Sequence, residues 1–485
     1  MTLPSRIPPY VALIPVCIGV FIAADDQTVV VTVLPRIMLD MNVPVTELDR
    51  ASWTITGYLL GYLVAMPLIG RLSDVWGHRK IFVWSMVLFM IGSALVALTT
   101  SLDWLVATRV FQAVGAGALV PVSIAIVGDL FPPNRRGLPM GLIGASTEAG
   151  GVIGPLWGGI IIRYLDWQWV FWINIPLGAA VLVGIAVLLR PSPRYSAKVD
   201  YLGGVLIAAS LAALTLALSR VDARDLLMVG YLAVFGASSV LFVVRQRLVA
   251  EPLLPSSMFR HRAFNAANVT HMLVGGALII GMVTVPLMAN TVLALTPLEG
   301  GLRLMRLTAG ISAGAALGGA ACRRLDYRIP TVAGLLLAAT GYAFMSRWDL
   351  NVADPAMTVH LVTTGLGFGL VIAPIALAAT NSVGAGDRGA AAATITAMRM
   401  VGMTLGLATL TAWGTGRFQV LVAGIPFAPQ EGETFAQSQQ RFQAQTVDAG
   451  LTLFNDFFLV AMGVCLVALL PAVLMHWHRT REDIA

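Results

Sequence analysis

The chain has 485 residues, of which 57% are hydrophobic and only 12% charged, and its mean hydropathy is +0.81. This composition excludes a water-soluble globular protein and predicts an all-α polytopic membrane protein. The net charge of +6 comes without a basic patch interleaved with aromatic residues, so it indicates membrane topology rather than nucleic-acid binding.

Residues that would support metal or covalent chemistry are few. Cys17, Cys322 and Cys465 lie in apolar segments as small packing residues, and the six histidines show no metal-ligand spacing. No nucleophile, base and orienting group cluster at a recognisable spacing. The sequence therefore predicts no metal site, no cofactor and no enzyme activity.

Apolar runs of the length that crosses a bilayer, about 20 residues, follow one another along the chain. Because unpaired backbone is excluded from lipid, each run should be a helix. The first run contains Asp25 and Asp26 and is too long for a cleavable signal peptide, so it should remain as the first helix. We expect fourteen transmembrane helices, beginning near Tyr10, Ala51, Ile81, Trp104, Leu138, Trp169, Leu202, Leu226, Phe264, Leu298, Pro330, Met357, Gly389 and Leu451.

Breaks in composition divide the chain into three parts. Residues 1–189 should form a six-helix bundle, residues 190–250 a linker with two extra helices, and residues 251–485 a second six-helix bundle. The linker opens on a Pro/Arg-rich segment, residues 190–194. Two parallel halves around a midplane cavity are the arrangement that we expect.

The distribution of Lys and Arg predicts the orientation. An N-terminus in the cytoplasm places most of these residues on the cytoplasmic side, which predicts a cytoplasmic (inner) membrane location with both termini cytoplasmic. One long outer loop, residues 417–449, then faces outward. Loops of this length are usually functional or flexible. It could be a docking surface for an extracytoplasmic partner, or a disordered or locally helical hairpin.

Charged and titratable groups are concentrated in the short segment Gly70–Lys80, between two apolar runs. Gly70 and Gly77 permit tight backbone geometry, and Asp74 can cap a helix N-terminus. The basic residues of the segment can pair with Asp74 or with anionic headgroups; these residues are Arg71, Arg79 and Lys80. The spacing G-x-L-S-D-x-x-G-x-R-K resembles the signature loop of the major facilitator superfamily, a cytoplasmic gating motif. A fainter echo of this segment occurs at Gly318–Asp326.

Acidic residues lie at bilayer depth, where a lone carboxylate costs about 2.5 to 3.5 kcal/mol. Asp25 and Asp26 lie more than halfway across the first helix and point about 100° apart, and we expect Asp25 to face a cavity. Glu148 lies near the middle of the fifth helix, where burial favours the protonated form and makes it a possible proton carrier. The alternative for these acids is a permanent ion pair or hydrogen bond with neighbouring helices.

Four arginines also lie inside predicted helices. Arg109 lies near the outer end of the fourth helix, where it can be buried or extend to the headgroups. Arg303 and Arg306 share a face of the tenth helix, and Arg399 lies in the middle of the thirteenth. These second-half arginines can neutralise first-half acids or bind anionic groups of a substrate, with fixed salt bridges or headgroup contacts as the alternative.

Small residues recur at helical spacing in the fifth helix. Gly150, Gly154 and Gly158 are four apart and share one face, which permits close approach of a neighbouring helix. Pro155 should bend the helix there, and Gly159 completes the pattern. This run resembles the motif G-x-x-x-G-P-x-x-G-G of antiporters, which is typical of exporters in the superfamily.

Further segments resemble the fourteen-helix drug:H+ antiporter family. They are Asp25-x-x-Thr28, Arg109–Gly115 and Trp167–Pro176. Segment Ile55–Tyr62, Glu148 and the extended outer loop also resemble the mycobacterial exporters of triacylglycerides and drugs, which act with a lipid-carrying lipoprotein. The resemblance implies that Asp25 and Arg109 take part in proton coupling, and its burial makes Glu148 a third candidate. Charge and depth make Asp26 and the second-half arginines candidates for lining the cavity or pairing charges, although the family commonly has Pro in place of Arg306.

The function that this resemblance implies is a proton-driven antiporter. It would export hydrophobic or amphiphilic compounds, drugs or lipids such as triacylglycerides, by alternating access, as a monomer in the lipid bilayer. The proton gradient would be its energy source and an extracytoplasmic lipoprotein its partner. Two other classes stay open: proton-coupled uptake of a small metabolite, and a non-transporting membrane scaffold for a lipid-carrying partner.

Overall fold

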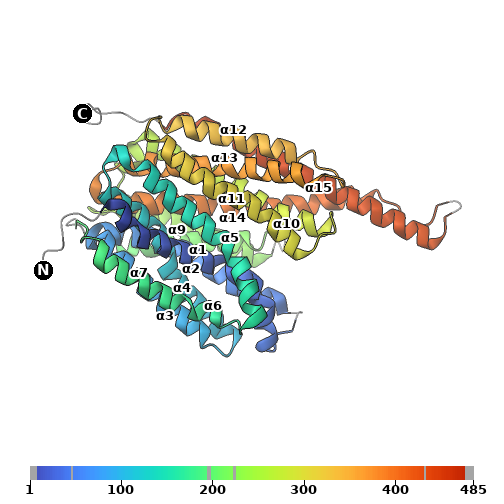
Figure 1. Ribbon diagram of the computed structural model, residues 1–485, viewed down its shortest axis with the longest axis horizontal. Helices are drawn as coiled ribbons and strands as arrows, with labels where there is room; N and C mark the ends of the chain where they lie inside the picture. The colour runs from blue at the N-terminus through green and yellow to red at the C-terminus, as the bar shows by residue number, and fades with distance from the viewer. Residues whose placement is uncertain (1–7, 45–46, 194–197, 222–224, 431–432, 476–485) are drawn as a thin grey trace.

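The computed structural model describes residues 8–44, 47–193, 198–221, 225–430 and 433–475 (Figure 1). Arg194 of the predicted linker and the terminal residues Arg6, Arg479 and Arg481 lie outside this part of the chain. The regular elements in the described part are helices. The long ones are α1 (Pro9–Asp40), α2 (Leu48–Trp76), α3 (His78–Ala97), α4 (Leu102–Leu130), α5 (Gly137–Tyr164), α6 (Trp169–Trp172) continuing into α7 (Asn174–Leu188), α8 (Tyr201–Leu218), α9 (Leu226–Leu248), α10 (Arg262–Thr291), α11 (Pro297–Ala321), α12 (Arg328–Met345), α13 (Asp354–Asn381), α14 (Arg388–Ala423) and α15 (Phe435–Ala472).

With α6 and α7 taken as one broken helix, these are the fourteen helices that the sequence predicts. In the described residues, twelve helical segments are long and apolar enough to cross a membrane. The other two, α5 and α11, have 28 and 25 residues and carry acidic or basic side chains in mid-helix. They pack along each other in the middle of the molecule (Figure 1). The prediction of an all-helical membrane protein is confirmed.

Helix contacts fall into two groups joined by a few interfaces. Helices α1 to α7 pack on one another, and so do α10 to α15. The two groups, which we call the first and second halves, meet through α5 with α11 and through α2 and α4 with α14. Helices α8 and α9 pair with each other, and α8 also contacts α2 and α14. The division of the chain into domains stays a prediction.

The segment expected to be a long outer loop is largely helical. Helix α14 continues to Ala423 and α15 begins at Phe435, so only a short connection separates them. A capping box between Thr434 and Gln437 fixes the start of α15. Of the forms that the sequence left open for the outer loop 417–449, the structure has the locally helical hairpin. We call residues 417–449 the hairpin.

The bundle has two distinct ends. The start of α1 and the end of α15 lie at one of them, and the hairpin projects beyond the other (Figure 1). We call these the termini end and the hairpin end. Helix α1 leaves the termini end and α2 returns to it, so the segment Gly70–Lys80 lies at this end. The connection between α4 and α5 and the start of α14 lie there too, in contact with this segment and with each other.

Candidate functional site

A fully buried ion pair joins α1 to α4 within the first half. Arg109 donates from a terminal nitrogen to Asp26 Oδ2 at 2.6 Å, and both side chains are 0% exposed. Gln112 and Asn174 donate to Asp26 Oδ1, each at 3.0 Å. The guanidinium also lies 4.0 Å from the centre of the Tyr58 ring. Arg109 is thus buried rather than extended toward headgroups, and every close partner of the pair belongs to the same half.

Asn174 is a residue that sequence reasoning missed. Segment Trp167–Pro176 is typical of an interfacial aromatic belt, yet the structure brings Asn174 into the centre of the first half, against Asp26 and Ser93. A buried carboxylate needs several donors because its lone pairs lose water. The polar residue at the break between α6 and α7 is the signal that could have indicated such a donor.

Asp25 lies in the contact between α1 and α5. Its side chain is almost buried, and its Oδ1 has no hydrogen-bond partner among the described residues. The glycine face of α5 packs on this part of α1: a Cβ at Gly154 would lie 2.7 Å from the Asp25 carbonyl oxygen, and one at Gly158 would lie 2.8 Å from Val29. The two segments singled out in the sequence, Asp25-x-x-Thr28 and the glycine run, therefore pack against each other.

A second buried ion pair crosses from the first half to the second. Arg399 of α14 donates to Glu148 Oε1 of α5 at 2.5 Å. The two side chains are 12% and 7% exposed. Of the three second-half arginines, Arg399 is the one placed against a first-half acid. Because its partners sit on different halves, this pair must change if the halves move apart.

Arg303 and Arg306 do not reach a first-half acid. Both lie against Asp354 at the start of α13, at 3.6 and 2.6 Å. Asp354 is 52% exposed, and Arg303 also donates to the Glu299 carbonyl oxygen within α11. The alternative of fixed salt bridges between helices is therefore what the structure has for these two residues, because α11 and α13 are neighbours in the same half.

A cavity of about 380 Å³ lies between the two halves and α8. Its wall is mostly apolar, with a few hydroxyl and amide groups. The larger side chains that line it are Gln27, Leu59, Leu63, Leu218, Ile279, Met400, Met403 and Leu407. Met400 follows Arg399 directly, so the wall of the cavity adjoins the ion pair that links the halves. Asp25, expected in the cavity, lies instead in the contact between α1 and α5 described above.

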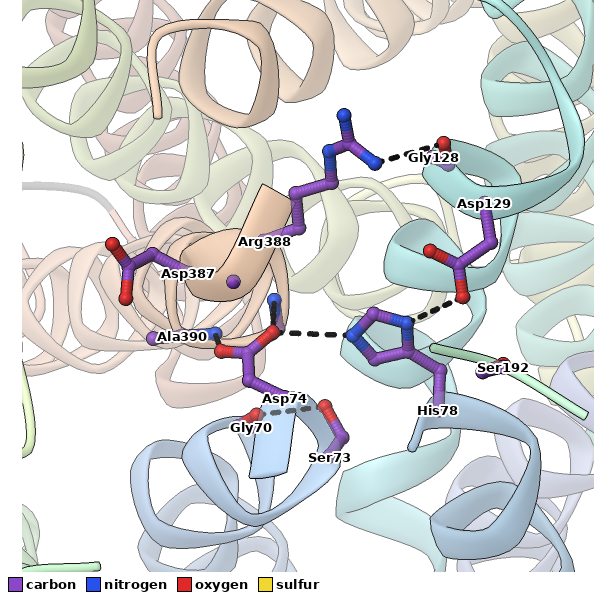
Figure 2. A network of polar contacts seen from close by, with 12 residues as sticks. Gly70, Ser73, Asp74, His78, Gly128, Asp129, Ser192, Asp387, Arg388 and Ala390 are labelled. Carbon is purple, nitrogen blue, oxygen red and sulfur yellow. Dashed lines mark hydrogen bonds and ion pairs between the residues drawn. The ribbon is translucent and has the colours of Figure 1, made fainter. Parts of the chain in front are cut away.

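At the termini end, Asp74 caps a helix of the other half. Its two carboxylate oxygens accept from the backbone N–H groups of Gly389 and Ala390, at 2.6 and 2.9 Å (Figure 2). These N–H groups belong to the first turn of α14, where a carboxylate stabilises the helix. The expectation that Asp74 caps a helix N-terminus is met here, with its own helix α2 in one half and the capped helix in the other.

The partner of Asp74 within the first half is His78, which sequence reasoning did not select. Its two ring nitrogens lie 3.1 Å from Asp74 and 2.7 Å from Asp129 of α4 (Figure 2). The imidazole thus bridges two carboxylates that otherwise repel each other. A histidine between two aspartates in neighbouring helices could not be recognised from spacing, because Asp129 is distant in the sequence.

The basic residues of the segment Gly70–Lys80 contact groups other than Asp74. Arg71 pairs with Asp387 of the second half at 2.7 Å. The Arg79 side chain donates to the Ala186 carbonyl oxygen and its backbone N–H donates to Ser192 Oγ, and Lys80 lies over the Trp76 ring. Pairing of Asp74 with these basic residues is therefore not what the structure shows.

Glycine permits the closest approach of the halves at this end. A Cβ at Gly70 would overlap Ala393 and lie 2.7 Å from the Gly389 carbonyl oxygen. Gly77 has a φ of 95°, a backbone conformation that favours glycine, at the break between α2 and α3. Glycines of α5 and α11, Gly137 and Gly319 among them, make a similar backbone contact on the other side of the molecule. The two halves are thus in contact at the termini end.

Among the described residues, no group of three or more His, Cys, Asp or Glu side chains could hold a metal ion. The chemistry that the arrangement supports is charge pairing, proton binding and the enclosure of apolar molecules. Two helical halves, closed at one end around an apolar cavity and buried charges, define a membrane transporter.

Solved structures of low sequence identity share this fold. One is the human organic anion transporter MFSD10, with a TM-score of 0.62 and 16% identity over 95% of this chain and all of that one. Another is a proton:xylose symporter, with a TM-score of 0.61 and 13% identity over 92% of this chain and 94% of that one.

Residues 16–407 match the Major Facilitator Superfamily. A triacylglyceride transporter of Mycolicibacterium hassiacum is 36% identical over 92% of this chain and 88% of its own length. The triacylglyceride transporter of Mycobacterium tuberculosis is 33% identical over 96% of this chain and 94% of its own length. The chain therefore belongs to the major facilitator superfamily of membrane transporters, and it is not an enzyme.

Proposed function

We propose that this protein is a proton-driven antiporter that exports hydrophobic or amphiphilic lipids, triacylglycerides first among them, by alternating access. The proposal takes its cargo from the relatives named as triacylglyceride transporters, which match more than nine-tenths of the chain. It places both termini in the cytoplasm, so that the hairpin end faces outward.

The observation that carries the proposal is the apolar cavity beside an ion pair between the halves. A cavity of 380 Å³ whose wall is mostly apolar suits acyl chains, whose burial is non-directional. The adjoining pair, Glu148 with Arg399, supplies a charge that can be cancelled by one proton. Cargo space and proton site therefore adjoin at the interface that must move.

In the proposed cycle, the halves are in contact at the termini end in the conformation described here. A proton that enters from the hairpin end protonates Glu148, and the neutral acid loses its charge attraction to Arg399. The halves can then separate at the termini end and admit cargo from the inner side. Asp25, with an unpartnered buried oxygen, is the second proposed proton site, and Arg109 holds Asp26 in place through each cycle.

We further propose that the hairpin docks an extracytoplasmic lipoprotein that carries the lipid away. The hairpin projects beyond the bundle (Figure 1). Near its tip, Phe427 packs against Phe435 and Phe442, and Phe427 and Phe435 are 53% and 63% exposed. An exposed aromatic cluster at the end of a projecting element suits an apolar partner.

Reconstituted transport tests the function. The purified protein is placed in vesicles with a pH gradient, and the export of a fluorescent triacylglyceride is compared with that of a cationic dye. Glu148→Gln should abolish gradient-driven export while the thermal unfolding profile shows a folded protein, and Asp25→Asn should do the same. Full export by both variants would contradict the coupling, and transport toward the opposite side would favour uptake. Lipid binding without any dependence on the gradient would favour a scaffold.

A further inference from the structure

His271 of α10 is a buried histidine for which the mechanism above has no use. Its side chain lies against α14, with Nδ1 2.9 Å from the Ile395 carbonyl oxygen. A carbonyl oxygen only accepts, so Nδ1 carries the proton and Nε2 presents its lone pair. Nε2 is buried without a hydrogen-bond partner among the described residues, and the residue as a whole is 6% exposed.

The ring lines a second, smaller cavity of about 50 Å³ between the halves. Arg399 lines the same cavity, and its Nε is likewise buried without a partner in the described part of the chain. One unused donor and one unused acceptor therefore face a space large enough for water, which needs about 10 to 15 Å³. A single water can accept from Arg399 Nε and donate to His271 Nε2.

The small cavity places His271 beside the ion pair. A Cβ at Gly275 would overlap the Arg399 carbonyl oxygen, so this stretch of α10 lies level with Arg399 of α14. Arg399 lines the cavity together with His271 and is bonded to Glu148. A proton that leaves Glu148 on the side of Arg399 that faces the cavity meets His271.

We propose that His271 is a second protonation site of the interface, which takes the proton from Glu148 through water in the small cavity. This inference rests on the proposed proton coupling. In the transfer, the O–H bond of protonated Glu148 breaks as water takes that proton, and the water passes one of its own protons to Nε2. Glu148 becomes a carboxylate again and His271 an imidazolium, so the net charge of the group is unchanged.

The charged group that faces the ring, Arg399, disfavours a second cation there, so His271 can take the proton only as the Glu148 carboxylate re-forms beside Arg399. Arg399 faces the cavity from α14, Tyr62 from α2, and Glu148 of α5 is bonded to Arg399. Helices α4 and α13 contribute apolar side chains to the lining. The re-formed Glu148 carboxylate then lies near two cations, Arg399 and the imidazolium, and this re-forms the contact that closes the termini end. The transfer thus returns the pair to the closed arrangement while the proton moves to His271.

The test compares His271→Gln with a matched histidine variant, His360→Gln. His360 also lies in the second half, but its Nδ1 is already bonded to Trp348 and it stacks on Phe344. In vesicles, His271→Gln should lower gradient-driven export about tenfold or more and remove one titration from its pH profile. Exchange of lipid without a gradient should remain, and His360→Gln should resemble the wild type.

A spectroscopic measurement keeps the inference testable if the glutamine variant folds poorly. With 15N-labelled histidine in the wild-type protein, one of the six imidazoles should pass from an unprotonated to a protonated Nε2 within the pH range of export. That signal should be missing from His271→Gln. A wild-type pH profile in the variant, or an Nε2 that stays unprotonated wherever export occurs, overturns the proposal.

The two proposals fail in different ways. If wild-type export ignores the pH gradient, the proposed proton coupling falls, and the role of His271 falls with it. If the wild type is coupled and Glu148→Gln abolishes that coupling while His271→Gln does not, the role of His271 alone is refuted.

Discussion

At the scale of single residues, the location of an ion pair decides what it can do. The partners of Asp26 and Arg109 belong to one half, so their contact is preserved when the halves move as rigid bodies. Glu148 and Arg399 belong to different halves, so their contact opens and closes in the proposed cycle. The first pair is suited to holding three helices together, and the second to linking proton binding to movement.

Asp26→Asn should therefore destabilise the protein strongly. It leaves Arg109 buried without a counter-charge, which typically costs about 3 to 5 kcal/mol. Asp354→Asn is the matched control: Asp354 also pairs with arginine, but it is 52% exposed, and such pairs contribute about 0 to 1 kcal/mol. Thermal unfolding followed with a thiol-reactive dye measures both, since Cys322 and Cys465 are buried in the folded state. Equal unfolding temperatures for the two variants would contradict this distinction.

At the scale of elements, the packing of α1 on α5 depends on one face of α5. Gly150, Gly154 and Gly158 lie on this face, and a Cβ on any of them would collide with α1. Gly159 lies beside them in the sequence but on a different face, where a Cβ would meet only Thr32, at 3.9 Å. The motif in the sequence thus contains glycines with different physical roles.

Gly154→Ala and Gly159→Ala should differ accordingly. An added methyl at Gly154 presses on the Asp25 carbonyl oxygen and on Thr28, and overpacking of this kind typically costs about 1 to 3 kcal/mol. At Gly159 alanine has room and favours the helix by up to about 1 kcal/mol. Unfolding temperatures and export rates of the two variants check this. A loss of stability in Gly159→Ala as large as in Gly154→Ala would show that the contact is not what requires glycine.

The hairpin is held at its tip by Arg441. Its guanidinium donates to Glu433 at 2.9 Å and to the carbonyl oxygens of Pro426 and Ala428 at 2.9 and 3.1 Å. Arg441 and the Gln430 N–H, which both donate to Glu433, lower the pKa of that carboxyl below its usual value. The ion pair is therefore formed at neutral pH and lost as the pH falls through the lowered pKa.

Limited proteolysis of the hairpin should reveal this dependence. Arg441→Gln should speed cleavage between α14 and α15 at neutral pH, because three contacts of the connection are lost at once. Glu433→Gln should have a smaller effect, since Arg441 keeps its two carbonyl partners. Acidification through the lowered pKa of Glu433 should make the wild type resemble Glu433→Gln. If the wild type is cleaved at the same rate at neutral and at acidic pH, the role of the ion pair is contradicted.

The helices could be predicted from the sequence because apolar runs of membrane length leave the backbone no other structure. The same holds for the glycine face of α5, whose spacing is local. The partners of polar residues could not be predicted in this way. Asn174 and His78 meet their carboxylates only through the packing of distant helices, and Arg306 lies against Asp354 rather than a first-half acid for the same reason.

At the scale of the whole molecule, the halves are fastened differently on the two sides of the termini end. On one side, the Asp74 carboxylate caps α14 (Figure 2), and Arg71 pairs with Asp387. On the other, Gly319 of the segment Gly318–Asp326, near the end of α11, packs on Gly137 and Gly141 at the start of α5. The faint sequence echo between the two segments therefore corresponds to equivalent places in the fold, each with a glycine at a close backbone contact between the halves.

A covalent link across the charged side should lock the transporter. In Arg71→Cys/Asp387→Cys, a short bifunctional thiol reagent would join α2 to the start of α14, where the native side chains are 2.7 Å apart. Because these residues lie on different halves, the link should prevent opening at the termini end and stop export. A cleavable reagent should allow recovery after reduction.

The matched control places the same link within one half. Arg306→Cys/Asp354→Cys replaces a pair whose side chains are 2.6 Å apart, but α11 and α13 belong together. Its cross-linking should leave export close to that of the untreated variant. Export that continues in the fully cross-linked Arg71→Cys/Asp387→Cys protein would mean that the halves need not separate at this end. That result would remove alternating access across the Asp74 contact from the mechanism, whatever the cargo.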